Sequence, residues 1–271
     1  MLVPMQKRVK NHHQKSPKPS APKHAPTLYG AHAVREAWLN PARDVQALYL
    51  TPQSVRGFEA LLQEAQAREL KRPSVTVIEK EALERILPKG AVHQGIALCA
   101  SGLPESDVQD FIIQAHGRPR TVLAMLDQVT DPHNVGAILR SASAFGLHGV
   151  LMQKKHAPLL EGVLAKTACG AVEHIPVAQE TNLSRAIENL KDEGFYVIGL
   201  DERGEQTIGK AASGSLPDRI VLVLGAEGGG IRRLIQENCD VLVRLPTGGA
   251  IASLNVSNAA AVAFYALAAG G

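Results

Sequence analysis

Cysteines are scarce and widely spaced in this chain of 271 residues. Cys99, Cys169 and Cys239 lie 70 residues apart, so none belongs to a C-x-x-C pair of the kind that binds zinc or cycles as a dithiol. An odd number of cysteines suits a reducing compartment, where thiols are usually small buried side chains. We therefore predict no metal site and three buried thiols.

Membrane and export signals are also missing from the sequence. No apolar run approaches the roughly 18 residues of a membrane span. The basic N-terminus lacks the apolar segment of a secretory signal, and its proline and histidine density argues against an amphipathic transit peptide. These absences favour a cytoplasmic protein without a membrane partner.

Acidic residues are absent from residues 1–26, which contain six Lys and Arg and five prolines. Such a segment cannot bury enough apolar surface to offset its ordering entropy, so we predict a disordered basic tail. The remaining residues carry 23 basic and 26 acidic side chains, so the net charge of +3 comes from the tail. A mobile basic arm attracts phosphates, although a dispensable extension explains it equally well.

The rest of the chain alternates helical and strand patterns in two blocks. Alternating periods are typical of α/β folds, and the continuous apolar runs of the second block favour a mostly parallel sheet covered on both faces. We predict a small α/β unit at 27–101, a linker at 102–118 and a second α/β unit at 119–271. The expected helices are 31–38, 57–70, 79–87, 134–145, 159–168, 182–193, 230–238 and 255–269, with some helix allowed at 108–115. The expected strands are 45–50, 75–78, 95–100, 121–127, 149–152, 172–177, 195–200, 220–225 and 241–245.

The first of three loops with candidate functional residues is DPHNVGAILRSA (131–142). The residue before proline avoids the helical region, so a turn is expected after the strand, with Asn134 at the N-cap of the next helix. Asn134 then lies in the crevice where open α/β sheets bind ligands, and Arg140, off the apolar stripe, could reach it too. Taken alone, Asn134 is more simply explained as a cap and Arg140 as a solvated charge.

The second loop is LVLGAEGGGIRR (222–233), in which a buried strand runs into Gly225, then Glu227, then three glycines. Glycines let the backbone approach a ligand closely. The spacing matches neither G-x-G-x-x-G nor G-x-x-x-x-G-K-[ST], so a nucleotide-phosphate cradle is not supported. A tight structural turn is the alternative.

The third loop is RLPTGGAIASLNVSNAAA (244–261), which runs from Leu245 through a flexible passage to Ser253-Leu254-Asn255 and an Ala-rich helix. Ser253 or Asn255 would serve as an ordinary N-cap. The helix is apolar enough all round to be buried, and its small residues suit a close packing partner, either this chain or a second copy.

Together, in this order and at these separations, the three loops resemble the SpoU (TrmH-like) branch of the knotted SPOUT methyltransferases. The resemblance covers 121–268, including the segment ACGAVEHIPV (168–177), and its three motifs are Asn134 to Arg140, Gly225 to Gly230 and Leu245 to Asn255.

Two further segments, LYGAHAVREA (28–37) and HQGIALC (93–99), look like the N-terminal domain of the bacterial 23S rRNA guanosine 2′-O-methyltransferases. That domain resembles the kink-turn-binding type of ribosomal protein, so the resemblance implies that the first unit binds the RNA substrate. A transfer RNA or another ribosomal RNA site stays open as the target.

The resemblance also implies a trefoil knot in the C-terminal segment, a homodimer, and S-adenosylmethionine bound within the knot. It places the cofactor against Leu224, Gly225, Leu245, Ser253 and Leu254. For methyl transfer to a ribose 2′-hydroxyl of RNA, it implies as catalytic residues Asn134, Arg140, Glu227 and Asn255.

The role that the family often gives to the motif-one arginine, general base, conflicts with guanidinium chemistry. Guanidinium stays protonated at any relevant pH. We therefore expect Arg140 to bind the adjacent phosphate and stabilise the developing alkoxide. Asn134 and Asn255 would orient Arg140 and the ribose, and Glu227 would buttress the site.

Two other function classes fit less well. A non-catalytic RNA-binding relative would be expected to lack Asn134, Arg140, Ser253 or Asn255, and all four are present. A nucleotide-dependent oxidoreductase would need G-x-G-x-x-G in the first βα turn, where this sequence has DPHNVG.

Overall fold

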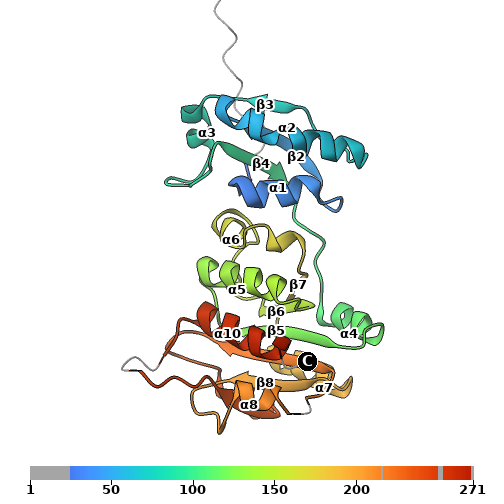
Figure 1. The fold of residues 1–271 in the computed structure, drawn as a ribbon, viewed down its shortest axis with the longest axis vertical. Coiled ribbons are helices and arrows are strands. Elements are labelled where there is room, and N and C mark those ends of the chain that lie inside the picture. Colours follow the sequence, from blue (N-terminus) through green and yellow to red (C-terminus); the bar gives the residue numbers. More distant parts are fainter. Residues whose placement is uncertain (1–24, 215, 250–252, 270–271) are drawn as a thin grey trace, which may run out of the picture.

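Two sheets organise the chain, one in each half. The computed structural model describes residues 25–214, 216–249 and 253–269. We predict a disordered tail at 1–26, and residues 1–24 of that segment lie outside the described residues. Figure 1 shows the two units stacked along the long axis, with α6 of the second unit facing α1 of the first.

The first unit has a four-stranded sheet of order β1-β4-β2-β3 among the described residues. β2 and β3 are parallel, whereas β4 is antiparallel to both β1 and β2. Trp38 and Phe58 pack edge to face in the apolar core, with ring centroids 5.9 Å apart. Its elements are β1 (Leu28–Tyr29), α1 (Ala31–Leu39), β2 (Val45–Leu50), α2 (Pro52–Ala67), β3 (Val75–Val77), α3 (Lys80–Ile86) and β4 (Ile96–Ala100).

In the described part of the second unit, seven strands form a sheet of order β7-β6-β5-β10-β8-β11-β9, with every neighbouring pair parallel. This confirms the predicted parallel α/β architecture, while the trefoil knot stays a prediction. Its elements are α4 (Val108–His116), β5 (Thr121–Asp127), α5 (Pro132–Ala144), β6 (Gly149–Gln153), α6 (Gly162–Thr167), a 3₁₀ helix (Ala171–Glu173), β7 (Val177–Glu180), α7 (Leu183–Asp192), β8 (Tyr196–Leu200), β9 (Gln206–Thr207), α8 (Ile208–Ala212), β10 (Arg219–Gly225), α9 (Arg233–Asn238), β11 (Val241–Arg244) and α10 (Val256–Ala269).

Helices cover both faces of the second sheet, as the alternation of side chains along β5 requires. Leu123 and Met125 pack in one cluster with α4, α7 and α9. Val122, Ala124 and Leu126 pack in another cluster with α5, α8 and α10. The period of two places successive residues on opposite faces, so a strand buried on both sides must be continuously apolar. The segment predicted as a linker, 102–118, contains α4, which belongs to this packed layer.

The strand predicted at 172–177 is wrong. Gly170 has a left-handed backbone (φ 91°), and the chain then forms a 3₁₀ turn over Ala171–Glu173 before β7 begins at Val177. Val172 and Ile175 are both buried, and their spacing of three fits a helical turn better than a strand.

The largest differences from the predicted helix boundaries occur in three helices. The helix predicted at 57–70 begins at Pro52, because proline is pre-organised for the first helical position. The helix predicted at 159–168 spans 162–167, and the helix predicted at 230–238 begins at Arg233.

Burial of the thiols and of the last helix is only partly as predicted. Cys99 is buried, whereas Cys169 and Cys239 are partly exposed. Desolvation raises the pKa of Cys99 to about 11 and that of Cys239 to about 12. α10 buries one face and exposes Val262 and Tyr265 on the other, so in a single chain it is not covered all round. Within the described residues, no helix combines the length and apolar character needed to cross a membrane.

A buried glycine lets α6 approach α5, which predicts the effect of substituting it. A Cβ on Gly136 would lie 2.7 Å from the backbone oxygen of Leu164 and 2.9 Å from Thr167 Cβ. Although alanine favours helix, we expect Gly136→Ala to lower the free energy of unfolding by about 1–3 kcal/mol through overpacking, measured by urea denaturation. The control is Gly57→Ala in α2, where nothing lies within 4 Å, and this change should stabilise by up to about 1 kcal/mol. Equal effects would contradict the packing argument.

Candidate functional site

The carboxyl ends of β8, β10 and β11 open onto one cavity. Because the strands are parallel, the loops that follow them gather at the same edge of the sheet, where open α/β folds bind ligands. The cavity has a volume of about 540 Å³, which lies within the range of small-molecule sites. Its lining residues are Leu200, Asp201, Glu202, Arg203, Leu224, Gly225, Ala226, Glu227, Gly228, Gly229, Gly230, Leu245, Thr247, Ser253, Leu254, Val256 and Ala259.

All five residues that the resemblance assigns to the cofactor line this cavity. They come from the end of β10, the end of β11 and the segment before α10, and they are Leu224, Gly225, Leu245, Ser253 and Leu254.

The glycine-rich turn closes on itself beside the cavity. A Cβ on Gly225 would lie 2.1 Å from the backbone carbon of Gly230, and the Gly230 amide donates to the Ala226 carbonyl at 2.8 Å. Gly230 has φ 61°, a conformation that side chains rarely adopt. The turn thus exposes backbone N–H and C=O groups to a ligand. Together with the leucine side chains that line the cavity, these groups suit a flat, partly apolar ligand such as a nucleoside.

Three of the four predicted catalytic residues form one hydrogen-bonded group. Glu227 Oε1 accepts from Asn134 Nδ2 at 3.0 Å and from Asn255 Nδ2 at 2.5 Å, and Asn255 Nδ2 also donates to Asn134 Oδ1 at 2.9 Å. Glu227 also lines the cavity. Residues 121 positions apart are therefore held at the rim of the same pocket.

Asn134 is not the N-cap of α5, so that prediction is wrong. Asp131 caps the helix by accepting from the His133 amide at 3.1 Å, with Pro132 at the first helical position. This leaves the Asn134 side chain, on the first turn, available to Glu227. Asn255, by contrast, does act as a cap, since its Oδ1 accepts from the Ser257 amide at 2.9 Å.

Arg140 stands apart from the other three candidates. It is exposed, and its Nη1 donates to Cys169 Sγ at 3.4 Å. Six residues separate it from Asn134, which corresponds to roughly 9 Å along a helix. Within one chain, α5 therefore presents Asn134 to the cavity rim and Arg140 to the turn that contains Cys169.

An ion pair between a buried carboxylate and a part-exposed arginine, which sequence reasoning missed, supports the glycine-rich loop. Asp127, fully buried at the end of β5, accepts from the Arg232 amide and from Arg232 Nε, both at 2.8 Å. This pair fixes the loop after β10 against the strand that leads to Asn134. An acid as the last residue of an apolar strand was the available signal.

A second ion pair, at the cavity wall, was also missed. Asp201 is buried after β8 and accepts from Arg203 Nε and Nη2, both at 2.8 Å. The hydrogen bonds from Arg203 lower the pKa of the Asp201 carboxyl against the opposing effect of burial. Asp201 therefore stays ionised, and both side chains line the cavity.

The Asp127 pair predicts a large effect from a small change. Both carboxylate oxygens accept hydrogen bonds, whereas an amide would turn a donor toward one of the Arg232 N–H groups. We expect Asp127→Asn to lower the free energy of unfolding by about 2–3 kcal/mol, measured by urea denaturation. The matched control is Asp131→Asn, because Asp and Asn cap helices about equally well and the change should cost only a few tenths of a kcal/mol. If Asp127→Asn leaves the free energy of unfolding unchanged, the ion pair does not stabilise the fold.

Comparisons with known proteins agree with this geometry. Residues 121–265 match the SpoU rRNA Methylase family, and residues 27–105 match the family described as RNA 2′-O ribose methyltransferase substrate binding. The chain is 36% identical over 241 residues to the 23S rRNA (guanosine-2′-O-)-methyltransferase RlmB of Salmonella typhimurium, which covers 88% of this chain and 96% of that protein. RlmB of Escherichia coli (strain K12) is 35% identical, with the same coverage.

A solved structure shows the same fold. The SpoU methyltransferase AviRb from Streptomyces viridochromogenes, in complex with the cofactor AdoMet, has a TM-score of 0.71 at 21% identity, covering 89% of this chain and 88% of that chain. The sequence matches and the two-unit architecture together show that the chain belongs to the SpoU rRNA methylase family.

Proposed function

We propose that this protein transfers a methyl group from S-adenosylmethionine to a ribose 2′-hydroxyl of RNA, at a guanosine of 23S ribosomal RNA. One observation carries the proposal: Glu227 lines the cavity and at the same time binds Asn134 and Asn255. A cofactor pocket and a set of polar groups for the acceptor hydroxyl therefore share one wall.

The cavity fits the proposed cofactor in size and in lining. Leu224, Leu245 and Leu254 offer apolar contacts to a purine, and the backbone of the turn at Gly225–Gly230 offers hydrogen-bond donors and acceptors, with Ser253 beside them. When bound, S-adenosylmethionine supplies a methyl group on a positively charged sulfur.

The polar group at the rim orients the acceptor. Asn134 and Asn255 are each tied to Glu227, so their amides have fixed directions before RNA arrives. Because these amides are already held in place, they can position a ribose hydroxyl for in-line attack without a further loss of their own conformational entropy.

Arg140 binds the phosphate next to the target ribose. It is exposed, always charged and set away from the cavity rim, as a phosphate ligand for a neighbouring position of the RNA backbone would be. Its forked N–H groups suit a phosphate, and its contact with Cys169, away from the rim, argues against the expected contact with the attacking oxygen.

The ribosomal target is supported by the names of the relatives. RlmB proteins are 35–38% identical over 88% of the chain. We assign substrate binding to residues 27–101, methyl transfer to 119–271 and the connection to 102–118. A transfer RNA is the second candidate, since the TrmH family tRNA/rRNA methyltransferase YacO of Bacillus subtilis is 34% identical.

We further propose that two copies associate and act in the cytoplasm. Val262 and Tyr265 leave an apolar strip of α10 uncovered in one chain, beside Phe145, whose ring lies 6.0 Å from that of Tyr265. Burial of this apolar strip against a second copy of the chain would favour association of the two copies. A monomer in ultracentrifugation at micromolar concentration would contradict the association.

Cofactor binding and ribose mapping test the proposed function. Calorimetry on the full chain should detect uptake of S-adenosylmethionine, with and without RNA. Cells that lack the gene should lose a 2′-O-methylguanosine in 23S RNA. No uptake, or unchanged RNA, would refute the proposal, and a lost mark on transfer RNA would redirect the target.

Substituting Arg140 tests its role separately. We expect Arg140→Lys to leave S-adenosylmethionine affinity unchanged and to lower methyl transfer by about 10–100-fold, because lysine keeps the charge but loses the fork. Single-turnover assays measure this effect, and the control is Arg233→Lys, at an exposed arginine of α9 that pairs with Glu237. Near wild-type turnover would show that the fork is unnecessary.

A further inference from the structure

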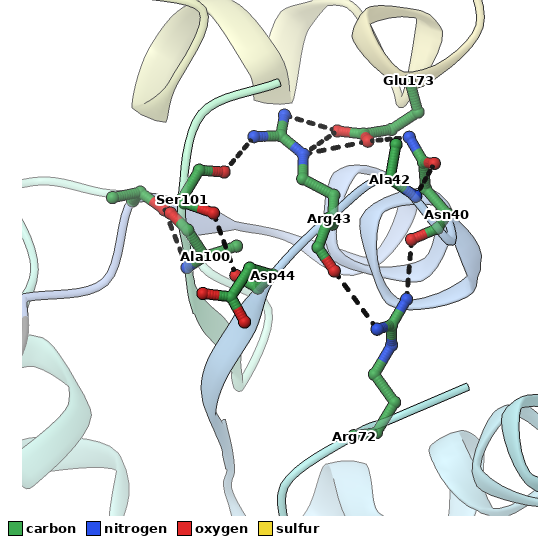
Figure 2. A network of polar contacts seen from close by, with 9 residues as sticks. Asn40, Ala42, Arg43, Asp44, Arg72, Ala100, Ser101 and Glu173 are labelled. Carbon is green, nitrogen blue, oxygen red and sulfur yellow. Dashed lines mark hydrogen bonds and ion pairs between the residues drawn. The ribbon is translucent and has the colours of Figure 1, made fainter. Parts of the chain in front are cut away.

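A fully buried ion pair joins the two units. Arg43 follows α1 in the first unit, and Glu173 lies in the 3₁₀ turn of the second, 130 positions away. Arg43 Nη2 lies 2.8 Å from Glu173 Oε1, Nε donates to Oε2 at 3.0 Å, and both side chains are only 2% exposed. The remaining guanidinium nitrogen, Nη1, donates to the Ser101 carbonyl at 2.6 Å, so each of the three guanidinium nitrogens donates to an oxygen, as Figure 2 shows.

The first unit holds Arg43 in place by itself. Arg72 donates to the backbone carbonyls of Asn40 and Arg43, at 2.7 and 3.2 Å (Figure 2). It also donates to the Trp38 carbonyl at 2.6 Å, so it braces the loop between α1 and β2. Asn40 from the same loop adds a hydrogen bond to Glu173 Oε2 at 2.8 Å. The loop therefore presents a preformed receptor for one carboxylate.

The second unit receives this loop on the turn that also contacts Arg140. Cys169, which accepts from Arg140 Nη1, is four residues before Glu173. Between them, Gly170 has φ 91°, and a Cβ there would lie 2.3 Å from Glu36 Cγ of the first unit. One short turn thus touches the first unit on one side and the proposed phosphate ligand on the other.

The Arg43–Glu173 ion pair contributes more to the relative orientation of the two units than to the stability of their association. Buried ion pairs gain little over apolar side chains of similar size, because desolvation opposes the attraction. The apolar cluster that runs from Leu28 and Trp38 to Ala171 and Val172 already supplies adhesion between the units. If the units rotated against each other, however, Arg43 and Glu173 would each be left charged and buried, which is strongly unfavourable.

We infer that the Arg43–Glu173 ion pair fixes the orientation of the substrate-binding unit over the turn at Cys169, and thereby determines which ribose of the bound RNA reaches the site. This inference rests on the proposed function. Arg43 and Glu173 are positioning residues: both are buried in the docked state, so neither contacts RNA.

Hydrogen exchange of the full-length chain tests the docking without reference to activity. The Gly162 amide donates to the Thr27 carbonyl at 2.8 Å across the two units, and it reports their separation. We expect Arg43→Ala and Glu173→Ala to speed exchange in peptides that contain Gly162 by about tenfold or more, because the uncompensated charge is hydrated when the units part. The control is Arg68→Ala, which removes an exposed ion pair with Glu64 at the C-terminal end of α2 and should leave exchange in these peptides unchanged.

Methylation mapping tests the consequence. With S-adenosylmethionine affinity unchanged, both variants should lower kcat/KM for ribosomal RNA by about tenfold or more and should spread methylation to riboses near the target. Arg43→Lys, which keeps the charge, should recover part of both losses. If an alanine variant does not fold, Glu173→Gln and Arg43→Lys carry the same comparison.

Two results would overturn the inference: wild-type exchange at Gly162 in the variants, or undiminished site fidelity when the units have separated. Failure of the proposed function can be distinguished from failure of this inference. If the wild-type protein neither bound S-adenosylmethionine nor methylated RNA, hydrogen exchange would still show whether the ion pair holds the two units together.

Discussion

Parallel pairing of β5 with β10 is the constraint on which the candidate site depends. Seven consecutive residue pairs keep the two strands in register, from Thr121 opposite Arg219 to Asp127 opposite Gly225. Both strands therefore end at the same level, and the loops that follow them must meet. Asp127 then binds Arg232 beyond the glycine-rich turn, which locks the second loop against the first.

Different parts of the site meet the two main requirements of methyl transfer, which are binding the cofactor and orienting the acceptor hydroxyl. Backbone and leucines form the cavity wall, which suits a ligand recognised by shape and by main-chain donors and acceptors. Side-chain amides tied to Glu227 form the rim, where direction matters more than shape. Because Glu227 belongs to both, movement of the glycine-rich turn would disturb the cofactor and the acceptor hydroxyl together.

The junction between the units links substrate binding to the same machinery. Strand β1 and helix α1 of the first unit pack on α6 and on the 3₁₀ turn of the second, and apolar contacts continue from one core into the other. A substrate-binding unit on a loose tether would search a large volume, whereas a docked one presents RNA at a defined place. The buried pair of Arg43 and Glu173 makes one docked orientation preferable to others.

Local pattern in the sequence determined the α/β class, the parallel sheet and the three loops, because burial on both faces of a strand and glycine at a close approach leave direct marks on composition. The five cofactor residues came from the resemblance to the SpoU family, and all five line the cavity. Only the tertiary structure decided that residues 171–173 turn instead of pairing, that Asp131 rather than Asn134 caps α5, and that Arg140 points away from the cavity rim. It also decided the pairing of Arg43 with Glu173, since a contact across 130 positions depends on how two finished units dock and leaves no periodic signal in either segment.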